Sequence, residues 1–211
     1  MTRAILWVSL AGLALANDSD LGRVLKGVEA RYNHAKTLKV LFEETYTAQG
    51  RPRRSERGEL TLRKPGRMRW DYASPLGKLF LSDGHDVFLY SPDTRQVEKM
   101  KLKESEDMRA PLAFLLGKLD FSKEFRDFQM SADPGGSVLT AVPKSDRLPY
   151  EKIEMLVQPD FTIRRLVVTG QDKSILSFQF DKEQVGPAVN DAVFKFRMPP
   201  GATMAPTEAT Q

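Results

Sequence analysis

Apolar and polar side chains alternate along residues 58–91, and short groups of turn-forming residues interrupt the alternation. The alternating runs cover residues 58–63, 67–73, 78–82 and 86–91. Period-2 alternation bounded by proline and glycine is typical of strands that bury one face. The pattern therefore predicts an antiparallel meander, with Asp83-Gly84 as the tight turn of its last hairpin.

The segment before the meander predicts a helix followed by a long strand. Apolar residues recur at helical spacing over residues 20–35, and Ser19 or Asp20 can cap the start of this helix. The apolar stripe of the predicted helix consists of Leu21, Val24, Leu25, Val28 and Tyr32. Residues 38–49 then predict a strand, and the loop 50–55 returns the chain to the meander.

The segment after the meander predicts another strand, at 96–102, and then two helices. Residues 110–119 are apolar on nearly every side, with Pro111 suited to the first helical turn and Gly117 to the end. Such a helix must be covered on every side, so we expect it to lie over the sheet. A second short helix is predicted at 120–130. Its phenylalanines are spaced by four and three residues: Phe121, Phe125 and Phe128.

The C-terminal part of the chain returns to strands, which complete the predicted fold class. These strands are predicted at 137–143, 150–157, 162–169, 175–181 and 193–196. The whole pattern predicts a mainly β chain with about ten or eleven strands and about three helices. Because a twisted sheet of that size curls, we predict a half-open antiparallel β-barrel covered by a helical lid.

Both ends of the chain are predicted to lie outside this domain. Residues 1–16 place Arg3 before a short apolar run that ends in small residues, as in a cleaved signal peptide. We therefore expect a single domain over 17–204 and a disordered tail at 205–211. An uncleaved N-terminal anchor remains the alternative, although the apolar run is short for a bilayer.

Composition excludes several classes of function. The absence of cysteine excludes disulfides, thiolate chemistry and lipid attachment to an N-terminal cysteine. The net charge of +4 is too small to indicate nucleic-acid binding. One local basic cluster, Arg51, Arg53, Arg54 and Arg57, falls in a predicted loop. It is either a solvated turn or a docking patch for anionic headgroups or an acidic partner.

The residues that common enzyme chemistry requires are largely missing. His34 and His85 are the only histidines, and both are predicted to face solvent. Without cysteine, the common zinc and nucleophile arrangements are excluded, and no phosphate-binding loop, nucleophile elbow or dinucleotide fingerprint occurs. Carboxylates alternate with apolar residues on the predicted strands, which should point them outward. We expect no enzyme activity, metal or cofactor, with a paired-carboxylate hydrolase as the remaining enzyme alternative.

Several short motifs follow one another in a characteristic order. They are Gly58-x-Leu60-x-Leu62-x-Lys64-Pro65, Arg69-Trp70, Ser82-Asp83-Gly84, Val87 to Tyr90 with Pro92, and Phe194-x-Phe196 before Pro199 and Gly201. In the order and spacing of these motifs the chain resembles LolA, the periplasmic lipoprotein carrier family. No single motif is decisive, but together they touch most of the chain.

The resemblance implies a half-open β-barrel with a helical lid and an apolar cavity. The implied function is to take acylated lipoproteins from an inner-membrane lipoprotein-releasing transporter to an outer-membrane lipoprotein receptor through the periplasm. The receptor is anchored through a cysteine, so the missing cysteine favours the carrier, expected to be a monomer. The cavity should be lined by the apolar face of the meander: Leu60, Leu62, Met68, Trp70, Tyr72, Phe88 and Tyr90.

Under the same resemblance, the apolar helix becomes the lid, with Leu112, Phe114, Leu115 and Leu116 over the cavity. In the best-studied carriers an arginine before the strand-breaking proline locks the lid by hydrogen bonds. Here Lys64 occupies that place, and lysine donates to carbonyl groups without the planar fork of arginine. The gate is therefore expected to be weaker or built differently, with an ordinary charge before a turn as the alternative.

A sensor or receptor module that binds envelope lipids or lipoproteins on the same fold is the alternative function. Such modules usually carry a further domain, for which this chain has little room. Bound acylated protein or phospholipid in material purified from the periplasm would favour the carrier.

Overall fold

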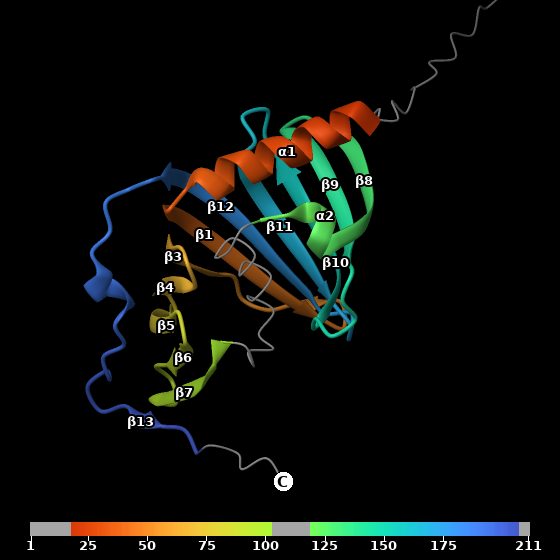
Figure 1. Cartoon of the computed structure of the whole chain (residues 1–211). Coiled ribbons are helices and arrows are strands. Elements are labelled where there is room, and N and C mark those ends of the chain that lie inside the picture. The colour runs from red at the N-terminus through yellow and green to blue at the C-terminus, as the bar shows by residue number, and fades with distance from the viewer. Residues whose placement is uncertain (1–17, 103–118, 207–211) are drawn as a thin grey trace, which may run out of the picture.

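A single large sheet with a helix across one end forms the architecture (Figure 1). The computed structural model describes residues 18–102 and 119–206. The helices are α1 (Asp18–His34), α2 (Phe121–Glu124) and the 3₁₀ helix η3 (Asp191–Phe194). The strands are β1 (Thr37–Ala48), β2 (Arg51–Pro52), β3 (Glu56–Arg63), β4 (Arg67–Ser74), β5 (Leu76–Asp83), β6 (Asp86–Ser91), β7 (Gln96–Lys101), β8 (Phe125–Asp133), β9 (Gly136–Pro143), β10 (Tyr150–Val157), β11 (Ile163–Gly170), β12 (Ile175–Val185) and β13 (Thr203–Met204).

Two antiparallel meanders meet at the centre of the sheet. The strand order is β13-β7-β6-β5-β4-β3-β1-β12-β11-β10-β9-β8, with β2 paired to β1. The long pair of β1 and β12, with registers from Leu38↔Val185 to Thr47↔Ile175, joins the halves. Within the described ranges no ladder joins β8 to β13, so the sheet is open, as predicted for the half-open form.

Several predicted elements are confirmed. Helix α1 buries the predicted stripe against the sheet, with Val24, Val28 and Tyr32 at most 5 % exposed. Strands β3 to β6 form the predicted meander. The turn between β5 and β6 is Gly84-His85 rather than Asp83-Gly84, and Gly84 supplies the positive φ of +103°. The shift extends β5 by one residue to Asp83, and β6 begins at Asp86 as predicted.

Three predictions about the remaining elements are wrong. Residues 120–130 form only the four-residue α2, after which Phe125 is already extended and pairs with Pro143 in β9. Residues 193–196 belong to η3 and its exit, because the side chain of Asn190 caps a tight turn there. The described ranges contain 13 strands and two α-helices, against about ten or eleven and about three. The predicted signal peptide, most of the lid helix and residues 207–211 of the predicted tail lie outside the described residues.

A β-bulge explains why the phenylalanine spacing resembled that of a helix. The register of β8 shifts between Arg126 and Gln129, and Asp127 has a φ of +55°. In a regular strand, residues three apart point to opposite faces. The bulge lets Phe128, three residues after Phe125, reach the same cluster as Phe125 and Phe121. The ring centroids of Phe121 and Phe128 are 6.1 Å apart.

The two faces of the sheet have different covers. We call the face that packs against α1 the inner face. It carries one continuous hydrophobic core, in which side chains from both halves of the sheet take part. The opposite, outer face of β3 to β7 is crossed by residues 186–202, the C-terminal segment (Figure 1).

Arginines of the meander hold the C-terminal segment on the outer face. Arg63 donates to the Val189 carbonyl oxygen and to Asp191, and Arg69 donates to the Val193 carbonyl oxygen at 3.1 Å. Phe194 is buried there. The chain then ends this crossing in β13, which pairs in parallel with β7.

Candidate functional site

Aromatic side chains occupy the centre of the inner face. Phe42 of β1 meets the edges of two rings of β4, Trp70 at 4.6 Å and Tyr72 at 5.1 Å between centroids. Trp70 also contacts Phe178 of β12 at 5.5 Å, and Phe178 stacks on Phe180. The rings therefore bridge the two meanders at the point where β1 and β12 join them.

Gly58 makes room for this aromatic cluster. It lies beside Tyr72 in the β3–β4 pair, where the register shifts. A Cβ at Gly58 would lie 2.0 Å from the carbonyl oxygen of Asp71, so no other residue fits without moving backbone. The Tyr72 and Phe42 rings lie against each other at this position instead.

Five of the seven predicted cavity residues lie together on the inner face. They are Leu60, Leu62, Met68, Trp70 and Tyr72, and their exposed fractions are 0–4 %. At this degree of burial they pack with other core side chains. A guest reaches them only if side chains that now cover this face move aside.

The other two predicted cavity residues, Phe88 and Tyr90, lie on the outer face, so placing them with Trp70 was wrong. Register pairs Trp70 with Phe80 and Phe80 with Leu89, which puts Leu89 rather than its neighbours on the inner face. Phe88 stacks on Phe196 of the C-terminal segment at 4.4 Å. The sequence misled because β5 is apolar at both parities and the segment 87–90 is apolar or aromatic throughout.

The indole N–H of Trp70 is unusual in this core. The side chain is 0 % exposed, and within the described part of the chain its Nε1 has no hydrogen-bond partner. An unsatisfied buried donor is costly, and native structures contain few of them. The aromatic cluster thus contains a buried hydrogen-bond donor without a partner among the residues that the structure describes.

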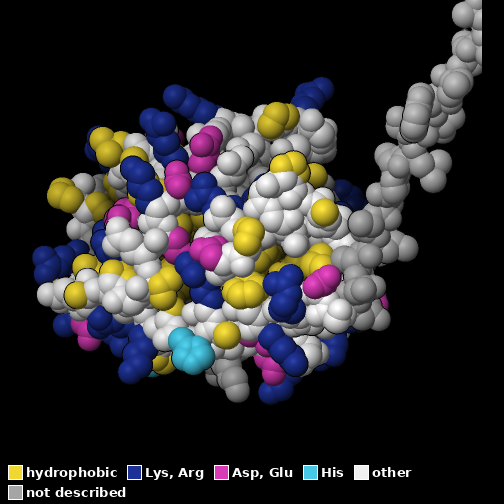
Figure 2. Space-filling view, turned by 90° about the horizontal axis from the view of Figure 1, so that it is seen from above, with side chains coloured by type: hydrophobic (Ala, Val, Ile, Leu, Met, Phe, Trp, Pro, Cys, Tyr) yellow, Lys and Arg dark blue, Asp and Glu magenta, His cyan; other side chains and the backbone are white. Residues whose placement is uncertain are grey.

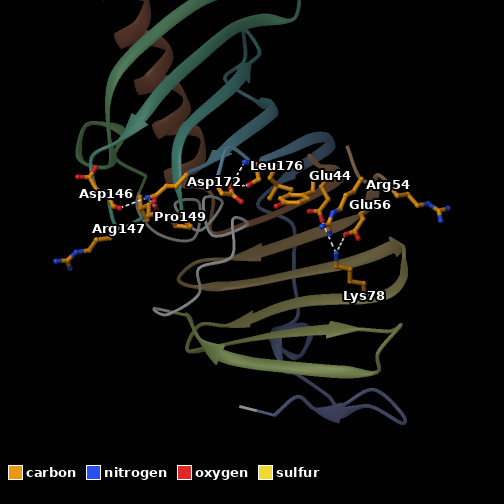
Figure 3. A pocket seen from close by; sticks show the side chains of 14 residues that line it. Glu44, Arg54, Glu56, Lys78, Asp146, Arg147, Pro149, Asp172 and Leu176 are labelled. Atoms are coloured by element: carbon orange, nitrogen blue, oxygen red, sulfur yellow. Dashed lines mark hydrogen bonds and ion pairs between the residues drawn. The ribbon is translucent and has the colours of Figure 1, made fainter. Parts of the chain in front are cut away.

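A pocket of about 700 Å³ lies at the end of the inner face far from α1 (Figure 3). We call it the distal pocket. Its apolar lining is Tyr46, Leu148, Pro149 and Leu176. Its charged lining is Arg53, Arg54, Lys78, Arg147, Glu44, Glu56, Asp146 and Asp172. Tyr46 and Leu148 also pack against the hydrophobic core, so the pocket continues from the apolar face.

A buried carboxylate marks the boundary between the core and the distal pocket. Glu44 is 4 % exposed, and the Tyr72 hydroxyl donates to its Oε1 at 3.0 Å. Lys78 bonds Glu56, lies 4.0 Å from Glu44 and stands over the Tyr72 ring. Figure 3 shows these three charged side chains pointing toward one another. Glu44 thus contradicts the expectation that strand carboxylates point outward.

Two residues of the basic cluster, Arg53 and Arg54, line this pocket, whereas Arg51 and Arg57 do not. Arg51, Arg53, Arg54 and Arg57 are all exposed, and Arg53 lies over the Tyr46 ring. Figure 3 shows Arg54 extending away from the pocket on one side and Arg147 on the other. Seen from the α1 side, the molecule mixes basic and acidic side chains with small groups of hydrophobic ones (Figure 2).

The predicted gate residue Lys64 binds α1. Its Nζ donates to the carbonyl oxygen of Tyr32 at 2.8 Å, in the last turn of the helix. Burial lowers the pKa of Lys64 below its ordinary value. The predicted lid residues Leu112, Phe114, Leu115 and Leu116 lie outside the described residues, so the gating role stays a prediction.

A polar network that the sequence did not suggest fixes the same end of α1. Tyr32 donates to Glu183 of β12 at 2.7 Å, Arg31 donates to the other oxygen, and the Ile163 amide donates to Tyr32. Burial raises the pKa of Tyr32 well above its ordinary value, and the charge of Glu183 raises it further. The partners are more than 130 residues apart, so no local motif signals this contact.

Neither a metal site nor a membrane-spanning helix occurs in the described part of the chain. Residues 18–102 and 119–206 hold no cluster of three or more histidine or acidic side chains placed to bind a metal ion. His34 and His85 are both exposed. No helix within these ranges is long and apolar enough to cross a membrane.

Comparison with known proteins places these features in a family. A family model described as outer membrane lipoprotein carrier protein LolA matches residues 33–197. An outer-membrane lipoprotein carrier protein of Pseudomonas aeruginosa (strain UCBPP-PA14) is 30 % identical over 196 residues, covering 90 % of each chain. One from Methylobacillus flagellatus is 26 % identical over 179 residues, covering 84 % of this chain and 86 % of the relative.

Solved structures share the fold at low sequence identity. An uncharacterized conserved protein from Thermus thermophilus superposes with a TM-score of 0.53 at 13 % identity, covering 88 % of this chain and 98 % of that one. The crystal structure of MucB gives a TM-score of 0.51 at 14 % identity, covering 86 % of this chain and 64 % of that one.

Proposed function

This chain belongs to the LolA family of outer membrane lipoprotein carrier proteins, and from that premise we propose that it shields the acyl chains of lipoproteins on its inner face. In this proposal the chain works in the periplasm. It takes its cargo from an inner-membrane lipoprotein-releasing transporter and delivers it to an outer-membrane lipoprotein receptor. The function is transport by binding, without catalysis.

The continuous apolar inner face is the single observation that carries the proposal. It runs through both meanders, from β6 through β1 and β12 to β9. Each acyl methylene removed from water contributes about 0.8 kcal/mol, so ten covered methylenes contribute about 8 kcal/mol before costs. An apolar surface of this extent is sufficient to hold a lipid tail in water.

Release also has a physical basis in this structure. Leu60, Met68 and Trp70 are covered by other side chains of the protein itself. Loading must therefore expose and replace contacts that the protein already makes, and this cost offsets part of the gain from binding the acyl chain. A carrier without an energy source needs such an offset, because otherwise its cargo would not leave.

We propose that the apolar residues around Leu115 cover the inner face and move aside for the guest. Replacing Leu115 with glutamate would put a charge into this apolar environment, which opposes both the covered state and the state with a bound guest. The expected result is a folded protein without bound acyl lipid. The matched control is Leu76→Glu, because Leu76 is 83 % exposed at the β4–β5 turn.

Native mass spectrometry of protein purified from the periplasm tests both the binding of acylated lipoprotein and the role of the residues around Leu115. We expect the unaltered chain and Leu76→Glu to carry acylated protein, and Leu115→Glu to have lost it, while circular dichroism reports the same sheet in all three. If Leu115→Glu carries as much acylated protein as the unaltered chain, the residues around Leu115 do not control cargo binding. An unaltered chain that never carries or accepts an acylated lipoprotein would overturn the proposed function.

A further inference from the structure

The unsatisfied indole N–H of Trp70 points to a feature of the guest. An indole nitrogen is a donor only, so the group that satisfies it must be a hydrogen-bond acceptor. The flanking rings of Phe42 and Phe178 offer no conventional acceptor. A purely apolar side chain at position 70 would avoid the cost of an unpaired donor.

Trp70 lies between the distal pocket and the wholly apolar part of the inner face, and this position limits the kind of acceptor that can reach it. Tyr72, two residues along β4, binds Glu44 at the edge of the distal pocket. Two residues of a strand span about 7 Å. Trp70 therefore lies one step deeper than the charged groups of Glu44 and Lys78, where the inner face becomes wholly apolar.

We propose that Trp70 Nε1 donates a hydrogen bond to the carbonyl oxygen of the ester or amide that joins an acyl chain to its carrier molecule. This proposal rests on the proposed function and adds an orientation to it. The polar end of the guest lies toward the distal pocket, and the hydrocarbon extends toward α1. The site thus recognises acyl esters and amides and binds bare hydrocarbon more weakly.

The chemistry of an acyl guest supports this assignment over a charged one. Its carbonyl is the acceptor closest to the hydrocarbon, and it reaches an apolar depth at a lower desolvation cost than a charged group. A phosphate or carboxylate placed beside Trp70 would lose its hydration in an apolar environment. The mixed charges of the distal pocket provide a polar environment for the rest of the guest.

Nuclear magnetic resonance observes this hydrogen bond directly. The chain has two tryptophans, Trp7 and Trp70, so a Trp7→Phe background leaves one indole signal. Methyl laurate and dodecane, each presented from cyclodextrin, provide chains of matched length with and without a carbonyl. We expect methyl laurate to move the indole proton signal downfield and dodecane to leave it without that shift.

An isosteric replacement of Trp70 measures the contribution to affinity. A benzothienylalanine side chain at position 70 keeps the bicyclic shape and replaces the N–H with sulfur. We expect the preference for methyl laurate over dodecane to fall roughly three- to tenfold, as for loss of one buried hydrogen bond. The empty variant should be at least as stable as the parent, because the unpaired donor is gone.

The outcomes separate this inference from the proposed function. Equal indole shifts with both guests, no shift with either bound guest, or an unchanged ester preference in the benzothienylalanine variant would overturn the role of Trp70. Acylated lipoprotein binding would then still stand on its own measurement. A chain that binds lipoprotein but neither small guest likewise contradicts the inference alone.

Discussion

At the scale of single residues, the most informative side chains are polar ones buried in an otherwise apolar protein. Tyr32, Glu44 and Trp70 are each at most 4 % exposed. Tyr32 and Glu44 have partners that fix elements to one another, whereas the Trp70 N–H has none among the described residues. Paired groups of this kind help to specify the fold, and the unpaired N–H of Trp70 is the basis of the guest contact that we propose.

Tyr32 should make stability depend on alkaline pH. Tyr32→Phe leaves Glu183 and the Ile163 amide without the hydroxyl that they bind, so it should lower the free energy of unfolding by about 2 kcal/mol at neutral pH. The folded-state pKa of Tyr32 is raised, so its contribution is complete below pH 10, the ordinary value, and is lost as pH rises above it.

Urea denaturation between pH 7 and 11 checks this prediction. The difference between the parent and Tyr32→Phe should shrink above pH 10. A difference that stays constant across this range would contradict the role assigned to the Tyr32 hydroxyl.

Lys78 should contribute strongly to stability, because it lies between the carboxylates of Glu44 and Glu56. Lys78→Met leaves Glu44 and Glu56 close together without this cation, and breaking such a partly buried pair should cost about 2–4 kcal/mol. Thermal denaturation at pH 7 measures this loss.

The control for Lys78→Met is a lysine–glutamate ion pair on the solvent-exposed surface of the same protein. Lys173 is 2.6 Å from Glu151, with exposed fractions of 73 % and 40 % for the two side chains. Lys173→Met should change stability by less than about 0.5 kcal/mol. If Lys78→Met and Lys173→Met lose the same stability, the burial of Glu44 does not strengthen the contribution of its lysine partner.

At the scale of elements, bulges and anchors decide where strands point. The β3–β4 register shifts at Gly58, beside the aromatic cluster, and the bulge at Asp127 shifts the register of β8. The C-terminal segment then covers the outer face of the meander and is held by arginine side chains. These irregular places shape the sheet as much as the regular ladders do.

Two glycines give opposite predictions. Gly58→Ala forces a Cβ against the Asp71 carbonyl oxygen, so it should destabilise the chain by about 3 kcal/mol or more. Gly22 lies in α1, and a Cβ added there would meet no described atom within 4 Å, so Gly22→Ala should stabilise by about 0.5–1 kcal/mol. Chemical denaturation of both variants provides the test, and a tolerated Gly58→Ala would contradict the close packing of β3 and β4.

At the scale of the whole molecule, the open sheet of the described residues explains how an extended apolar face forms without a closed barrel. Its two halves meet at the β1–β12 pair, α1 covers one end, and the distal pocket lies at the other (Figures 1 and 3). This layout gives the inner face a direction, with a closed end and a polar end. An amphiphilic guest matches that direction.

The sequence by itself determined the positions of most strands, the buried stripe of α1 and the apolar face of β3 and β4. These depend on local patterns, namely a period of 2 or 3.6 and the turn preferences of glycine and proline. The motifs around Lys64, Trp70 and Gly84 also sufficed to indicate the family.

Only the tertiary structure decided the facing of β6, the burial of Glu44 and the pairing of Tyr32 with Glu183. Alternation fixes which residues of one strand share a face, but register between strands decides which face that is. Phe88 and Tyr90 therefore lie on the outer face, although their own strand carries no sign of this. Glu44 and Tyr32 meet partners that only folding brings close, so no period in the sequence records those contacts.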